Sequence, residues 1–281
     1  MKNQFANNVV FSVYLWTEHE LLQKGEAYIN NTSKLYYTAD SRQPNKVAYS
    51  APFKQWVYDS GVNGANIPTS ISGSFGIINK GESGLMFDFD NGRVLLNSGV
   101  GKNLNITGSY SIKEVNFYIS NETEENIIIN DKYFFNPRYA GKPTSGIAPY
   151  AITTPAIFIV QNGNNSEPFA LGGMMDTKMN MSLIVMAESS YQLSNILSFF
   201  NDKKHKYIPL MDLSLDPINE YGDLKSGYNY NLLSAPFSTP GNLLFIEEID
   251  SSILSDELRT NYKLFLGEID LTLSYPRYIG N

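Results

Sequence analysis

The sequence predicts an α+β fold that is mainly antiparallel β. It also predicts one prominent helix packed on a sheet in the C-terminal half and an irregular N-terminal arm. Residues 73–135 alternate apolar and polar side chains at the period of a strand. Residues 189–200 repeat apolar side chains at helical spacing. Residues 28–69 carry many aromatic side chains that follow neither period.

Composition favours a protein that contacts other proteins over one that catalyses a reaction. The 281 residues include no cysteine and only two histidines, His19 and His205. These residue types supply most nucleophilic, proton-transferring and transition-metal chemistry. Charged residues make up only 17% of the chain, and depletion of charge is typical of the cores of protein interfaces. We therefore expect no enzyme, no cofactor and no metal site.

The net charge of −7 argues against a broad nucleic-acid surface, so at most incidental DNA contact is expected. No apolar run approaches the ~20 residues that span a bilayer, and Met1–Asn8 does not resemble a signal peptide. The one dense basic run covers residues 203–206. A solvated helix end is the favoured interpretation, because cations suit a helix C-terminus. Contact with an acidic partner is the alternative.

Four regions are expected along the chain. Residues 1–70 form an extended arm with a short helix, and residues 71–140 form a β-rich region. Residues 141–155 are a seam rich in Gly and Pro, which interrupt regular structure. Residues 156–281 form an α+β domain.

The arm contains a helix-start signal and a group of unexplained aromatic residues. Thr17-Glu18-His19-Glu20 fits a capping box, which places His19 on the surface of a first helical turn. The aromatic side chains farther on need cover from another surface. We expect the arm to lie against a neighbouring subunit, and the alternative is that it folds on its own body. The candidate interface residues are Tyr36, Tyr37, Phe53, Trp56 and Tyr58.

The β-rich region contains a hairpin over residues 84–96, in which Asn91-Gly92 predicts a type I′ turn. An EF-hand beginning at Asp88 is excluded, because Gly99 occupies the twelfth position, where a Glu is needed. The apolar alternation changes phase near Lys113-Glu114, which requires a bulge or a break. The next turn is charged, and adjacent acids there are expected to be solvated rather than catalytic. Its acids are Glu122, Glu124 and Glu125.

The C-terminal half predicts two short strands, 156–160 and 168–171, and then a strand over 179–187 that is buried on both faces. The capped helix 189–200 follows. A polar connection, 201–231, comes next, and its acids could hold a hard cation but are expected to face water. These are Asp212, Asp216, Glu220 and Asp223. Strands over 243–246 and 265–275 end the pattern.

Several segments resemble structural proteins of tailed bacteriophages. They are Gly84-Leu-Met-Phe-Asp-Phe-Asp-Asn-Gly-Arg-Val-Leu-Leu96, residues 172–177, residues 188–193 and residues 267–277. They are most similar to neck or tail-completion proteins of contractile-tailed phages, and the element order of 156–275 is similar to tail-terminator folds. The resemblance implies a homomeric ring, a hexamer, that joins head to tail within the virion and performs no catalysis. It also implies other neck, tail-tube or sheath proteins as partners, with assembly in the host bacterial cytoplasm.

Two hypotheses from different classes follow. The first is a virion structural protein that forms a ring in the neck or at the head-proximal end of the tail. The alternative is a carbohydrate- or receptor-binding β module of a phage tail, because exposed Tyr and Trp side chains can stack on sugars. A carboxylate-based hydrolase ranks third. Assembly state and glycan affinity separate the first two.

Overall fold

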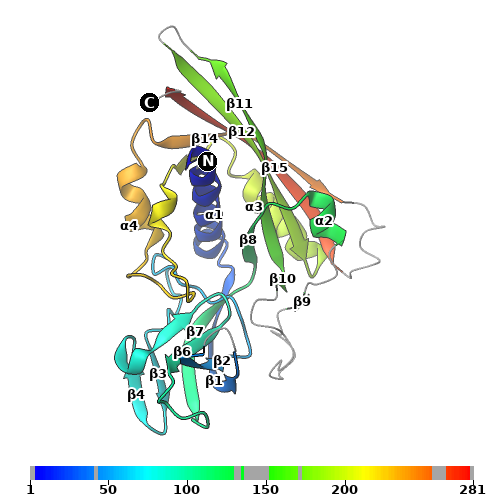
Figure 1. The fold of residues 1–281 in the computed structure, drawn as a ribbon. Helices are drawn as coiled ribbons and strands as arrows, with labels where there is room; N and C mark the ends of the chain where they lie inside the picture. The colour runs from blue at the N-terminus through cyan, green and yellow to red at the C-terminus, as the bar shows by residue number, and fades with distance from the viewer. Residues whose placement is uncertain are drawn as a thin grey trace.

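A long helix, α1 (Gln4–Lys24), runs along one β-sheet and reaches a second sheet with its C-terminal end (Figure 1). The computed structural model describes residues 4–40, 44–129, 134–135, 152–169, 173–254 and 264–278. Within these residues the fold is α+β and mostly antiparallel β, which confirms the predicted fold class at that level.

The first sheet has seven strands in the order β4-β3-β7-β1-β2-β6-β5, and every pair is antiparallel. Its strands all come from the first 113 residues. They are β1 (Tyr28–Thr38), β2 (Lys46–Ser50), β3 (Ser70–Gly73), β4 (Gly76–Asn79), β5 (Met86–Asp88), β6 (Arg93–Asn97) and β7 (Ile106–Lys113).

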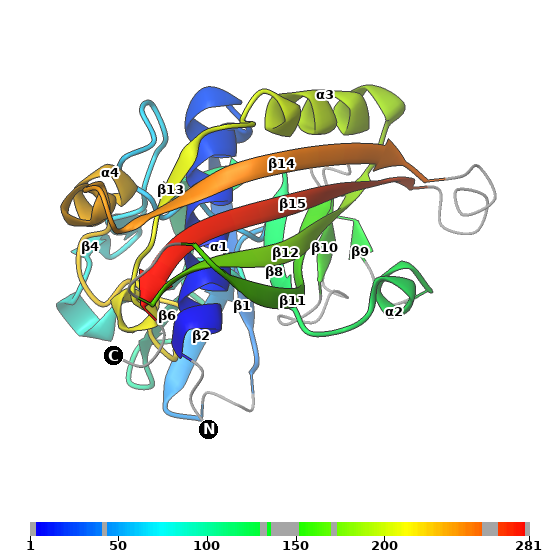
Figure 2. The same cartoon turned by 90° about the horizontal axis from the view of Figure 1, so that it is seen from above.

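The second sheet has six strands in the order β13-β14-β15-β12-β11-β8 (Figure 2). Only the pair of β8 with β11 is parallel. The strands are β8 (Asn116–Ser120), β11 (Ala156–Pro168), β12 (Met174–Ala187), β13 (Tyr207–Pro209), β14 (Leu243–Ile253) and β15 (Phe265–Tyr278). A separate two-stranded pair joins β9 (Phe134–Phe135) to β10 (Thr153–Thr154).

The helix predicted in the C-terminal half is α3 (Ser190–Asn201), which packs on β12, β14 and β15. Ser189 caps it by accepting a hydrogen bond from the Gln192 amide, and the predicted apolar face is buried. The longest described helix is nevertheless α1. The remaining short helices are α2 (Glu124–Ile129), α4 (Tyr230–Ser234), η1 (Glu82–Gly84), η2 (Leu213–Leu215) and η3 (Ala235–Phe237).

The prediction of an irregular N-terminal arm is wrong. The helix α1 has 21 residues, and every residue from Phe11 to Leu22 except Tyr14 is buried. A helix enclosed on all sides has no polar face, so it shows no amphipathic period in the sequence. The predicted capping box lies inside this helix, where the Thr17 hydroxyl donates to the carbonyl of Val13 at 2.8 Å.

The boundary predicted at residue 70 is also wrong, because it cuts through one sheet. Strand β1 pairs with β7 from Tyr28 to Leu35, and β2 pairs with β6 over all five of its residues. The boundary between sheets lies instead at Glu114-Val115, where the chain leaves β7 and enters β8. This crossing is the predicted break in strand phase. The predicted seam lies mostly outside the described residues.

The hairpin of residues 84–96 is confirmed by the pairing of β5 with β6. The prediction of a type I′ turn is wrong. Four residues connect Asp88 to Arg93, and only Gly92 among them has a positive φ, 62°. The Asp88 carboxylate organises this loop by accepting hydrogen bonds from the backbone and side-chain amides of Asn91. Side-chain hydrogen bonds of this kind stabilise the four-residue loop, whereas a two-residue turn would not need them.

Strand β11 was expected as two short strands around a turn, but it is one strand of 13 residues. Its pairing with β12 shifts between Gln161 and Gly163, so a bulge at Asn162 replaces the expected turn. The expectation that the 179–187 strand is buried on both faces is confirmed for Met181–Ala187 of β12.

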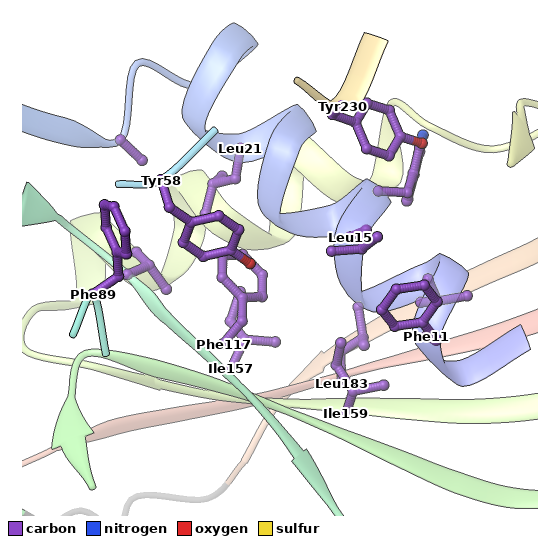
Figure 3. Close-up of a cluster of buried hydrophobic side chains, with 14 of the residues drawn as sticks. Phe11, Leu15, Leu21, Tyr58, Phe89, Phe117, Ile157, Ile159, Leu183 and Tyr230 are labelled. Atoms are coloured by element: carbon purple, nitrogen blue, oxygen red, sulfur yellow. The ribbon is translucent and has the colours of Figure 1, made fainter. Parts of the chain in front are cut away.

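The core lies between α1 and the two sheets (Figure 3). Phe11 and Leu15 of α1 pack towards Ile159 and Leu183 of the six-stranded sheet, and Met179 and Met181 of β12 belong to the same core. A second, smaller core forms where α2 covers the opposite face of this sheet with Ile127 and Ile128.

We expect Gly92→Val to destabilise the protein by more than the ~1–2 kcal/mol of a left-handed backbone, because its Cβ would also overlap the Phe53 carbonyl oxygen. Gly76 is the matched control, since its φ is +95° but no atom lies within 4 Å of a Cβ there. Urea denaturation of both variants measures the difference. Equal losses of unfolding free energy would show that the contact with Phe53 does not constrain the loop.

Candidate functional site

The five predicted interface residues divide into two buried and three more accessible side chains. Trp56 is 1% exposed and Tyr58 is 2% exposed, so neither can anchor a neighbouring subunit in the folded chain. Phe53 is half-buried against the core. Tyr36 and Tyr37, at 42% and 41% exposure, remain available at the surface. The expectation that Trp56 anchors the arm to another subunit is therefore wrong.

Trp56 is enclosed by the chain's own strand β7. Its ring stacks on Tyr110 with centroids 4.3 Å apart, and its backbone bridges to Ile112. The indole nitrogen donates to the carbonyl of Phe53 at 3.1 Å. A buried indole needs such a partner, and this one lies three residues away in the same segment.

Tyr58 belongs to a buried charge network that joins α1 to the seven-stranded sheet. Its hydroxyl donates to Glu18 at 2.9 Å, and the other Glu18 oxygen lies 2.5 Å from the ammonium of Lys113 in β7. Both members of this ion pair are at most 5% exposed. Desolvation and then the negative charge of Glu18 raise the pKa of Tyr58, so its hydroxyl stays protonated and donates.

His19 is buried rather than on the surface, which corrects the expectation for this residue. Its Nδ1 lies 2.6 Å from Asp59, and its ring stacks on Tyr230 with centroids 4.5 Å apart. The other Asp59 oxygen accepts hydrogen bonds from the amides of Gly61 and Tyr230. The aspartate therefore ties the middle of α1 to the start of α4.

A histidine–carboxylate pair also occurs in hydrolases, where the second ring nitrogen activates a nucleophile next to a substrate cleft. Pockets open beside Ile196 of α3, beside Ile119 of β8 and beside Asp90, and His19 lines none of these three. With 5% of its surface exposed, this histidine is placed to connect elements and not to meet a substrate.

The acids singled out as possible cation ligands are spread over separate contacts. Asp212 caps η2, Asp216 accepts a hydrogen bond from the amide of Ile218 at 3.1 Å, and Asp223 pairs with Lys80 at 2.6 Å. The described residues contain no group of three or more His, Cys, Asp or Glu side chains placed to hold a metal ion.

The clearest accessible surface is an edge of the six-stranded sheet. Strand β8 pairs with β11 only as far as Ser120 opposite Val160, whereas β11 continues to Pro168. Residues 161–168 therefore pair with β12 on one side, and no strand of the described residues pairs with them on the other. Unpaired backbone at a sheet edge is a template for contact with another chain.

A groove of about 580 Å³ opens where β8 ends and this free edge begins. Its apolar lining includes Val10 and Phe11 of α1, Val160 of β11 and Ile119 of β8. Ile119 is 52% exposed, although it is a large aliphatic residue at the end of a strand. The groove thus offers apolar surface beside unpaired backbone.

Comparison with known proteins finds no matching family model and no matching curated protein. Within the residues that the structure describes, no helix has both the length and the hydrophobicity needed to cross a membrane.

We expect Lys113→Met to lower the free energy of unfolding by about 3–5 kcal/mol, because Glu18 would remain buried without its ion-pair partner. Lys24→Met is the control. Lys24 pairs with Glu20 but is 59% exposed, so its loss should cost below about 1 kcal/mol. Adding Glu18→Gln to Lys113→Met should recover part of the loss in urea denaturation. Similar costs for the two single variants would contradict a buried pair.

Asp90 should make stability depend on pH in an unusual direction. The residue borders a pocket of about 400 Å³ and is exposed there, yet protein atoms crowd its carboxyl. Desolvation raises its pKa to about 6, against the opposing effect of Lys113. The folded state therefore holds the proton more tightly than the unfolded state, and this residue's contribution to stability falls as pH rises from about 4 to about 6.

Asp90→Asn removes that penalty, so the variant should be more stable than the wild type at pH 7 and equally stable near pH 3. Because the side chain is partly solvated, the gain should be well below about 3 kcal/mol. Thermal denaturation across this pH range measures it. A gain that is the same at both pH values would show that charge on Asp90 is not the cause.

Proposed function

We propose that this chain is a structural virion protein of a tailed phage that assembles into a ring in the neck or at the head-proximal end of the tail. The observation that carries the proposal is the free edge of β11 beside the apolar groove at the end of β8. Such an edge supports contact between folded chains. A ring forms when one surface of a subunit binds a different surface of the next and the rotation closes.

Three further features favour assembly over chemistry. The charged fraction is low, at 17%. The histidine–carboxylate pair is enclosed in the core. The sequence segments that resemble phage structural proteins fall on elements of both sheets: residues 84–96 include the β5–β6 hairpin, and residues 267–277 lie within β15. We propose that the chain has no catalytic role and no cofactor. We also propose that its partners are neck, tube or sheath proteins.

The carbohydrate-binding alternative is the weaker candidate. Sugar recognition by stacking requires accessible aromatic faces, and Trp56 and Tyr58 are enclosed. Tyr36 and Tyr37 remain at the surface, but the Tyr37 ring already meets Tyr49 edge to face at 6.1 Å between centroids.

Light scattering coupled to size-exclusion chromatography, with electron microscopy of the main species, tests the proposal. We expect a closed ring of identical copies and no binding on a glycan array. Antibodies against the chain should label the junction of head and tail in virions of the phage that encodes it. A chain that stays monomeric at high concentration would overturn ring assembly, and glycan binding by that monomer would favour the alternative.

A further inference from the structure

The six-stranded sheet has two edges of opposite charge. One edge is formed by β13, which comes directly after the basic run of residues 203–206. The other edge is formed by β8 and the end of β11, and it lies next to the charged turn. Figure 2 shows β13 on one side of the sheet and β11, with α2 beyond it, on the other. The basic run of residues 203–206 and the charged turn after β8 therefore lie on opposite sides of one sheet.

The basic edge consists of Lys204, His205, Lys206 and Tyr207, all exposed. Within the described residues, neither lysine side chain forms an ion pair. The preceding Lys203 differs, because it pairs with Glu20 at 2.8 Å and is 12% exposed. Tyr207 begins β13 and is 57% exposed. This edge thus combines free positive charge with a projecting aromatic ring.

The acidic edge consists of Glu122, Glu125 and Glu167, together with the free backbone of residues 161–168. All three carboxylate residues are exposed, and none forms an ion pair in the part of the chain that the structure describes. Glu122 follows β8 directly and Glu125 lies in the first turn of α2. The groove beside Ile119 lies at the same edge.

The basic edge lies level with the part of β11 that extends beyond β8. Lys206 accepts a backbone hydrogen bond from Ile246, which lies opposite Leu273, and Leu273 lies opposite Met179. Met179 in turn lies opposite Asn164 in β11. Asn164 is four residues from Val160, where β8 ends and the groove begins.

We propose that copies of this chain associate head to tail, with the basic edge of one copy against the acidic edge of the next. This inference rests on the proposed ring assembly and specifies its interface. The lysines face the glutamates, and Tyr207 enters the apolar groove beside Ile119. Charge complementarity of this kind orients partners and excludes wrong pairings.

A second copy is the occupant that the surfaces favour, because one chain carries both halves of the contact on opposite sides of one sheet. The two halves cannot meet within a single molecule. Each copy therefore leaves one edge of each kind for its neighbours, which is the arrangement that a heterologous contact requires.

Charge reversal tests the interface in the full-length chain. Lys204→Glu/Lys206→Glu and Glu122→Lys/Glu125→Lys should each weaken association by about 10- to 100-fold in analytical ultracentrifugation, because like charges then meet. The variant that carries all four substitutions should assemble again, since the signs are exchanged. Assembly of the wild type should also weaken with added salt, because exposed charges are screened.

Two control variants separate this contact from general effects. Lys34→Glu/Lys102→Glu makes the same change of net charge on exposed residues of the other half of the molecule, and it should leave assembly unchanged. Tyr207→Ala should weaken assembly, whereas Tyr191→Ala should not, because Tyr191 is 83% exposed on α3 and outside both edges.

The outcomes distinguish this inference from the proposed function. A wild type that forms rings while either single-edge reversal leaves them intact would overturn the inference and leave ring assembly in place. Loss of rings in both reversals without recovery in the four-substitution variant would also overturn it. A wild type that never assembles would overturn ring assembly itself, and this interface with it.

Discussion

The fold depends on the burial of the central and C-terminal turns of α1, because a buried helix must find a partner for every polar group it carries. Three successive residues of this helix bind three different parts of the chain. Glu18 pairs with Lys113 of the seven-stranded sheet, His19 with Asp59, and Glu20 with Lys203 after α3. Breaking any one of these contacts would leave a charged or polar group in the core, so they fix how the helix and its surroundings fit together.

This arrangement explains why aromatic residues of the chain are buried in its own core. The first 113 residues form a complete sheet, and Trp56 and Tyr58 close the space between that sheet and α1. Trp56 and Tyr58, which were expected to hold a neighbouring subunit, pack instead within the chain's own core, whereas Tyr36 and Tyr37 stay at the surface. The periphery of the second sheet stays exposed, because strands end unevenly there and charged turns project from it.

The proposed interface and the buried network assign charge to different tasks. Inside, each charged group is matched at short distance, so its cost of desolvation is offset locally. At the sheet edges the charges are exposed and form no ion pair among the described residues, so they cost little in the single chain, and the proposed contact would supply their partners.

Local sequence patterns determined the elements that face solvent on one side. The capped helix α3, the β5–β6 hairpin and the change of phase at Lys113-Glu114 were all predicted, because half-buried elements carry a period and a turn or cap signal. The period fails for α1, which is buried all around, and for β11, where a bulge replaces the expected turn. Only the tertiary structure placed His19 beside Asp59 and Glu18 beside Lys113, since these pairs are 40 and 95 residues apart and no local pattern encodes them. The same holds for the two charged edges: the sequence contains both runs, but only strand order sets them on opposite sides of one sheet.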